Sequence, residues 1–102
     1  TAEKKAMGYY LDGQITVMFG THTHVQSADE QILEKGTAFI TDIGMTGPKN
    51  SVIGMDKDAA LKRFITSLPE KYKIATGDAI FNSVLFEIDD MTNKVKKITR
   101  IN

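Results

Sequence analysis

The sequence predicts a mixed fold of helices and strands, of the α/β or α+β class. Residues 56–68 place apolar side chains at helical spacing, residues 15–19 form a short apolar run typical of a strand, and residues 81–89 alternate between apolar and polar. With 102 residues, 41% hydrophobic and 25% charged, the chain has the composition of a globular domain or of a piece of one.

The first elements are predicted to be a helix and a buried strand. Residues 1–11 carry a spacing that predicts one apolar stripe along a helix: Ala2, Ala6, Tyr9 and Tyr10. Gly13 can take the left-handed conformation that follows a helix, and Gly8 suggests close packing against a neighbour. The strand at residues 15–19 follows.

Residues 37–41 predict a second strand, because β-branched and aromatic side chains dominate them. Residues 42–50 contain two glycines and a proline and are expected to form a loop. In the helix at residues 56–68, Asp56 is the expected N-cap and Pro69 ends the helix. Its apolar face is expected to lie in the core: Ala60, Leu61, Phe64, Ile65 and Leu68.

The C-terminal region predicts a hairpin, with strands at 81–89 and 95–101 around a connection at 90–93. Val84, Phe86 and Ile88 are expected to face one way. Four basic side chains on the last strand are interpreted as a solvated edge: Lys94, Lys96, Lys97 and Arg100. Nucleic-acid binding is disfavoured, because no aromatic residues for base stacking are interleaved with them.

Composition excludes several classes of protein. Thirteen basic and thirteen acidic residues cancel, so no overall field favours nucleic acid or a membrane surface. The apolar runs are far shorter than the roughly 20 residues needed to span a bilayer, so no membrane partner is expected. The absence of cysteine excludes disulfides and thiolate metal sites and fits a reducing cytoplasm, where we expect the protein to work.

Both histidines follow the first predicted strand, in Gly20-Thr21-His22-Thr23-His24. On an extended backbone, side chains two residues apart point to the same side, which would present both imidazoles to a metal or phosphoryl group. Two ligands make an incomplete site, and the alternative is that the histidines bond backbone groups or cap a turn. The nearby carboxylates Asp29 and Glu30 are expected to be surface or turn residues, not ligands.

The motif around the histidines is followed, at a specific distance, by Thr41-Asp42-Ile43-Gly44-Met45-Thr46-Gly47-Pro48. Together they resemble the C-terminal part of the YmdB-like branch of the calcineurin-like metallophosphoesterases. The resemblance covers most of the chain and is densest over residues 9–55. It implies a β-sandwich flanked by helices, of which residues 1–102 are a C-terminal fragment of a single metallophosphoesterase domain whose N-terminal portion is absent.

The resemblance also implies a phosphodiesterase acting on cyclic nucleotides, including the 2′,3′-cyclic type, with some phosphatase activity. His22 would bind one divalent metal ion and His24 a second, with iron or manganese favoured over zinc, and Thr46 would contact the substrate. The other ligands and the general acid of the family precede this stretch. No catalytic residue is therefore expected in this chain, and the chain without its N-terminal portion is expected to be inactive.

Two other functions are weighed against this one. A non-catalytic metal- or phosphate-binding or interaction module of the same fold is the main alternative. A serine hydrolase using Ser51 or Ser83 is disfavoured, because neither lies in a Gly-x-Ser-x-Gly setting. Since part of the sandwich would be uncovered, we expect the isolated chain to be marginally stable and to associate with itself, as a homo-oligomer.

Overall fold

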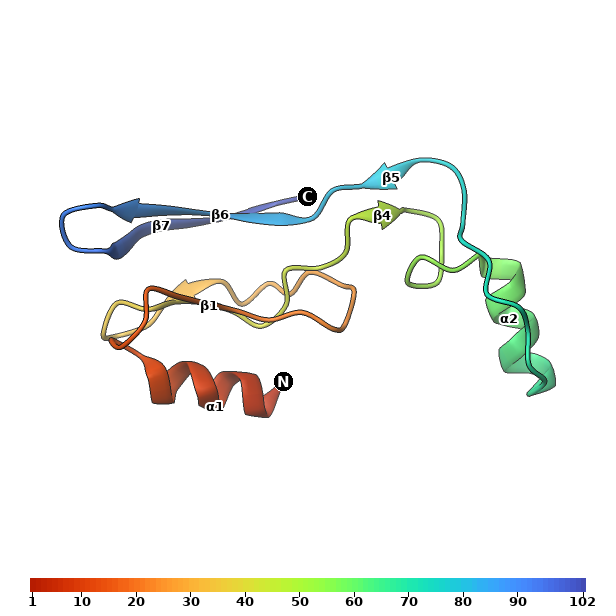
Figure 1. Ribbon diagram of the computed structural model, residues 1–102, viewed down its shortest axis with the longest axis horizontal. Helices are drawn as coiled ribbons and strands as arrows, with labels where there is room; N and C mark the ends of the chain where they lie inside the picture. Colours follow the sequence, from red (N-terminus) through yellow and green to blue (C-terminus); the bar gives the residue numbers. More distant parts are fainter. The chain divides into compact units, whose positions relative to one another are not determined.

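The computed structural model describes residues 1–102, which form two compact units. The first unit comprises residues 1–44 and 82–102, and the second comprises residues 45–81. The chain contains two helices and three small sheets, which confirms the predicted mixed class (Figure 1). That both units belong to one metallophosphoesterase domain stays a prediction.

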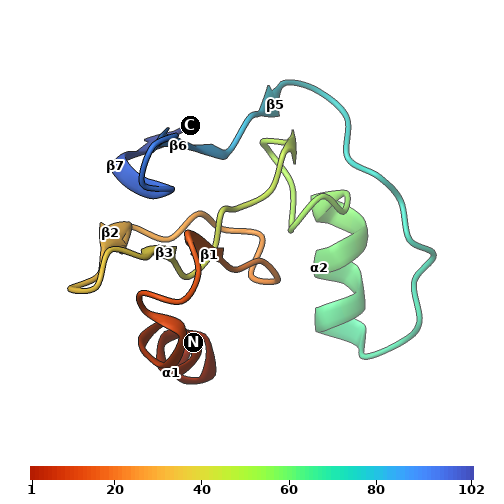
Figure 2. The ribbon, with the colours of Figure 1, turned by 60° about the vertical axis from the view of Figure 1, so that its left-hand side comes forward.

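The first unit has three layers. Its central sheet has the order β1-β3-β2, built from β1 (Val17–Phe19), β3 (Ala38–Ile40) and β2 (Gln31–Ile32). β1 runs parallel and β2 antiparallel to β3. Helix α1 (Ala2–Leu11) lies on one face of this sheet, and the hairpin of β6 (Ser83–Asp89) and β7 (Lys94–Ile101) lies on the other (Figures 1 and 2).

The core of this unit is centred on β3, where every residue is buried. Its flanks Thr37 and Asp42 are buried as well. β1 is an edge strand, half-buried, and Phe19 at its end is 55% exposed. The prediction of a buried strand is therefore wrong for β1, because the topology places the second predicted strand in the centre of the sheet.

Helix α1 has the predicted bounds but not the predicted face. Tyr9 and Tyr10 are 65% and 76% exposed, whereas Gly8 is the residue that the helix buries. A Cβ atom at Gly8 would lie 2.7 Å from the ring of Phe39. The helix thus approaches the sheet through its glycine, which confirms close packing there and explains why the bulky stripe lies outside. Gly13 takes the expected left-handed conformation, with φ +84°.

The C-terminal hairpin is confirmed, with one correction to its faces. Val84 and Phe86 are half-buried, but Ile88 is 47% exposed. The register shifts by one residue at this point, since Glu87 pairs with Lys97 and Ile88 with Val95, which leaves Lys96 of β7 as the extra residue of a bulge.

The basic cluster of β7 also divides. Lys94, Lys96 and Lys97 are exposed as predicted. Arg100 is half-buried, and its Nε lies 2.8 Å from Oε2 of Glu30. It belongs to an ion pair and not to a solvated edge.

The second unit contains α2 (Lys57–Thr66) and the two-residue strands β4 (Gly47–Pro48) and β5 (Ala79–Ile80), which pair antiparallel. Asp56 caps α2 as predicted, its carboxylate accepting a hydrogen bond of 3.1 Å from the Ala59 N–H. No helix of the protein is both long and apolar enough to cross a membrane.

The apolar face of α2 is not in a core, contrary to the prediction. Ala60 is buried, but Phe64 and Ile65 are 78% and 80% exposed, and Leu61 and Leu68 are also exposed. The helical spacing is confirmed, but the two short strands of this unit offer no surface wide enough to cover that face.

Candidate functional site

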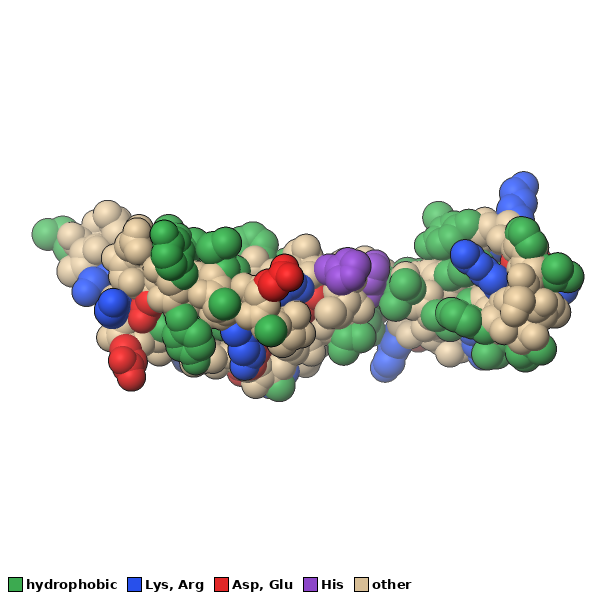
Figure 3. All heavy atoms as spheres, turned by 90° about the horizontal axis from the view of Figure 1, so that it is seen from below, with side chains coloured by type: hydrophobic (Ala, Val, Ile, Leu, Met, Phe, Trp, Pro, Cys, Tyr) green, Lys and Arg blue, Asp and Glu red, His purple; other side chains and the backbone are tan.

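The two histidines lie in a sharply bent, exposed segment, residues 21–25, which follows β1 and is called the histidine segment below. His22 has φ 108° and His24 has φ 68°, values uncommon for residues other than glycine. The backbone is therefore not extended there, and the prediction of an extended backbone at the two histidines is wrong. The imidazoles nevertheless gather at one place on the surface (Figure 3). Backbone of this kind costs of order 1–3 kcal/mol per residue and persists only where surrounding contacts enforce it.

The β1–β3 pairing extends up to the start of this segment. The Gly20 N–H donates to the Ile40 carbonyl at 3.0 Å, and the Ile43 N–H donates to the Gly20 carbonyl at 2.9 Å. A Cβ atom at Gly20 would lie 2.0 Å from the Thr41 carbonyl oxygen. Only glycine permits the backbone at residue 20 to approach the Thr41 carbonyl this closely. The glycine of the motif therefore allows the histidine segment to begin directly against the end of β3.

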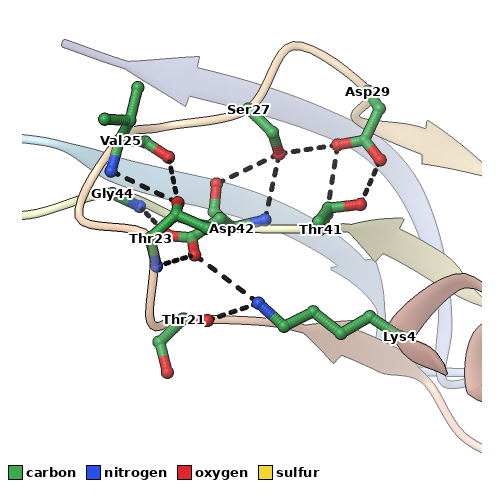
Figure 4. A network of polar contacts seen from close by, with 9 residues as sticks. All are labelled: Lys4, Thr21, Thr23, Val25, Ser27, Asp29, Thr41, Asp42 and Gly44. Carbon is green, nitrogen blue, oxygen red and sulfur yellow. Dashed lines mark hydrogen bonds and ion pairs between the residues drawn. The ribbon is translucent and has the colours of Figure 1, made fainter. Parts of the chain in front are cut away.

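Asp42, which follows β3, holds the middle of the histidine segment (Figure 4). Its side chain is only 2% exposed. Oδ2 accepts a hydrogen bond of 2.8 Å from the Thr23 N–H, and Oδ1 accepts one of 2.9 Å from the Gly44 N–H. Burial alone would raise the pKa of Asp42, but these donors and the nearby Lys4 hold it below its usual value.

Lys4 of α1 ties the same segment to the helix. Its ammonium group lies 3.6 Å from Oδ2 of Asp42 and donates a hydrogen bond to the Thr21 carbonyl (Figure 4). Lys4 thus holds the Thr21 carbonyl, just before His22, and Asp42 holds the Thr23 N–H, between the two histidines.

A second carboxylate, Asp29, completes the network on the side away from the histidines. It accepts hydrogen bonds from the Ser27 hydroxyl at 2.6 Å and from the Thr41 N–H at 3.1 Å, and one from the Thr41 hydroxyl. Partial burial opposes ionisation, but these bonds and the Lys5 charge lower its pKa to about 2.

Asp29 and Glu30 lie in a loop and keep part of their surface in water, so the expectation of surface or turn residues holds for their place in the chain but misses the partners that they bind. Asp29 is a half-buried structural acid, and Glu30 is half-buried against Arg100. The Arg100 guanidinium holds the pKa of Glu30 below its usual value. Both are occupied by partners inside the chain, so the view that they are not metal ligands stands as a prediction.

The donor set suits a divalent cation but is incomplete. No hydrogen bond or ion pair within the chain uses either imidazole, so both rings are free to act as ligands. No group of three or more His, Asp or Glu side chains is placed to hold a metal ion. The chain offers two nitrogen donors, and a complete site needs more.

Two other candidate residues, Thr46 and Ser51, lie in the second unit. Thr46 is exposed in the second unit, and its contact with substrate stays a prediction. The Ser51 hydroxyl donates to the Pro48 carbonyl at 2.7 Å and accepts from the Gly54 N–H, as a turn residue does.

The roles of Asp42 and Lys4 are not among those that the sequence predicts. Asp42 belongs to the motif, where the sequence predicts only the start of a loop. Its signal is the Asp-x-Gly spacing directly after an apolar strand, because aspartate often bonds the N–H two residues ahead. Lys4 carries no local signal, since it reaches residue 21 only through tertiary packing.

Known proteins resemble the chain over its whole length. The family described as YmdB-like protein matches residues 1–101. A Bacillus subtilis protein named 2′,3′-cyclic-nucleotide 2′-phosphodiesterase is 52% identical over 101 residues, which make up 99% of this chain and 38% of that protein. The chain therefore belongs to the YmdB-like family.

Two solved structures share the fold. A crystal structure described as a novel phosphatase from Mycoplasma pneumoniae has a TM-score of 0.92 and 44% identity, covering 98% of this chain and 36% of that one. A hypothetical protein from Thermus thermophilus also has a TM-score of 0.92, with 37% identity over 98% of this chain and 39% of its own. The chain thus spans well under half the length of the relatives it matches.

Proposed function

We propose that the protein containing this chain is a metal-dependent phosphoesterase of the cytoplasm, most specifically a phosphodiesterase of cyclic nucleotides such as the 2′,3′-cyclic type. The observation that carries the proposal is the pair of exposed imidazoles on a rigidly held, bent segment. The name of the Bacillus subtilis relative supports the substrate class.

In this proposal His22 and His24 each serve a divalent cation, with iron or manganese favoured and zinc as the third choice. Such cations, when bound, supply charge neutralisation on phosphoryl oxygens and make hydroxide available near neutral pH. The chain's own part is to hold two imidazoles at the surface. The remaining ligands and the general acid come from outside residues 1–102, because this chain has no further histidine.

Thr46 is proposed as a substrate contact, since the residue is exposed and threonine is a residue type that can hydrogen-bond a phosphoryl oxygen. It is a finer detail than the metal pair and is tested separately, by a change in KM for the cyclic nucleotide in Thr46→Ala.

The main experiment measures metal content and hydrolysis of a 2′,3′-cyclic nucleotide by the full-length protein. We expect about two divalent cations per wild-type chain and fewer in His22→Ala and His24→Ala. Activity should fall by about two orders of magnitude or more, because such cations contribute several kcal/mol to the transition state. Lys96→Ala, on the exposed side of β7, is the control and should behave as wild type.

Three outcomes decide between the hypotheses. Loss of metal and activity together supports the phosphodiesterase. A wild-type protein that binds metal but hydrolyses no phosphate ester would support the non-catalytic module. Histidine variants with unchanged metal content would overturn the assignment of His22 and His24.

A further inference from the structure

We propose that Asp42 and Lys4 are positioning residues for the candidate metal ligands: together they enforce the bent backbone that presents His22 and His24 at the surface. The proposal rests on the proposed function, since it concerns the two histidines as ligands. Neither residue touches the cation or the substrate in it.

The backbone at the histidines is the first support. Two residues with positive φ, one on either side of Thr23, will not persist unless tertiary contacts hold them. The Thr23 hydroxyl accepts from the Val25 N–H at 3.4 Å and donates to its carbonyl at 3.0 Å, which are contacts within the segment itself. Of the side chains elsewhere in the chain, Asp42 is the one that bonds Thr23.

The burial of Asp42 is the second support. Both carboxylate oxygens are already engaged by backbone N–H groups at 2.8 and 2.9 Å, and only 2% of the side chain is exposed. Asp42 therefore cannot turn outward to become a ligand without breaking these bonds. Its carboxylate instead fixes the position of the peptide between the two histidines.

Lys4 bonds the carbonyl of Thr21, the residue before His22. By donating to the Thr21 carbonyl while facing Asp42, its ammonium group orients the peptide that leads into His22. The segment is thus held at the Thr23 N–H, after His22, and at the Thr21 carbonyl, before His22. Residues that orient ligands in this way typically change metal affinity by about 10- to 100-fold when removed.

The test measures Mn²⁺ affinity of metal-free full-length protein by calorimetric titration, alongside its thermal unfolding. Asp42→Asn should bind Mn²⁺ about tenfold or more weakly. Asp12→Asn is the matched control, because Asp12 is also a buried carboxylate that accepts from two backbone N–H groups, those of Lys35 and Thr37, in a different loop. It should lose comparable stability and keep its Mn²⁺ affinity within about twofold.

Lys4→Met separates positioning from simple electrostatics and serves if Asp42→Asn does not fold. Removing a positive charge near a cation site should strengthen cation binding if only charge matters. Positioning predicts the opposite, a weakening of about threefold or more. Mn²⁺ affinity in Lys4→Met that is unchanged or higher overturns the proposal, as does an Asp42→Asn protein that binds like Asp12→Asn.

The histidine variants keep this test separate from that of the function. If wild type binds Mn²⁺ and His22→Ala and His24→Ala do not, normal affinity in either Asp42→Asn or Lys4→Met overturns the positioning role alone. If wild type binds no Mn²⁺, or the histidine variants bind it normally, the proposed function fails and the positioning role fails with it.

Discussion

Single carboxylates decide how the histidine segment of this chain is built. Asp29 and Asp42 flank the end of β3 and share contacts through Ser27, whose hydroxyl bonds both the Asp29 carboxylate and the Asp42 backbone (Figure 4). Asp42 bonds the segment that carries the histidines, whereas Asp29 bonds Ser27 and Thr41. The two acids therefore hold different parts of the chain, Asp42 the backbone between the histidines and Asp29 the turn around Ser27 and Thr41.

Replacement of Asp29 should reveal its contribution to stability. Its pKa falls from the ordinary 3.8 to about 2 in the folded protein, which corresponds to about 2 kcal/mol in favour of folding. Because folding lowers the pKa, this stabilisation is present above about pH 4 and is lost as pH falls toward 2. Asp29→Asn should thus cost about 2 kcal/mol at pH 7.

The measurement is urea unfolding of the full-length protein between pH 7 and pH 3. The difference between wild type and Asp29→Asn should shrink as the pH falls. Asp90→Asn, in the exposed hairpin connection, is the control and should change the free energy of unfolding by less than about 0.5 kcal/mol. A difference that stays constant with pH would contradict the role of the ionised carboxylate.

At the scale of elements, α1 packs so closely against β3 that no side chain fits at Gly8 unless the Phe39 ring shifts. Alanine is favoured over glycine in a helix by about 1 kcal/mol, but a Cβ at Gly8 would meet the Phe39 ring at 2.7 Å. That ring belongs to a residue that is only 2% exposed and has nowhere to move. Gly8→Ala should therefore destabilise the full-length protein by about 1–3 kcal/mol.

A double-mutant cycle with Phe39→Leu checks the cause. The smaller side chain should relieve the clash, so the two changes should couple by about 1 kcal/mol or more. Gly47→Ala is the matched control, because its Cβ would lie 3.7 Å from Met45, an ordinary contact. Strictly additive effects of Gly8→Ala and Phe39→Leu would show that the ring is not the obstacle.

These elements also show how far the sequence alone could go. Periodicity placed α1, α2 and the hairpin within a few residues of their bounds. It chose the wrong face for α1, because a glycine contact has no hydrophobic signature. It also assigned Ile88 to the covered side, because an alternating pattern does not show how much of a side chain its neighbours will cover.

At the scale of the whole molecule, the exposed apolar face of α2 has consequences for the chain on its own. Phe64 and Ile65 on α2, and Leu68 just beyond its C-terminal end, have most of their surface in water. We expect the isolated 102-residue chain to self-associate as its concentration rises, because burying this surface is favourable.

Sedimentation velocity over a range of concentrations measures this association. The double variant Phe64→Ser/Ile65→Ser should shift the chain toward 11.3 kDa, the mass of a single copy. Lys62→Ser/Arg63→Ser, exposed positions of the same helix, is the control and should leave the association in place. A wild-type chain that stays monomeric throughout would contradict the expectation.

The sequence by itself determined the class of fold, the family and the histidine motif, because these depend on local periodicity and on residue types at specific spacing. Tertiary structure decided which strand is central, which helix faces are covered, and that Asp42 and Lys4 hold the segment between β1 and β2 that carries the histidines. The contacts of Lys4 with the Thr21 carbonyl and of Asp42 with the Thr23 N–H join residues that are 17 and 19 apart in the chain and meet only when the layers pack. No local pattern encodes such a meeting, because its energy arises from burial and charge in the folded unit.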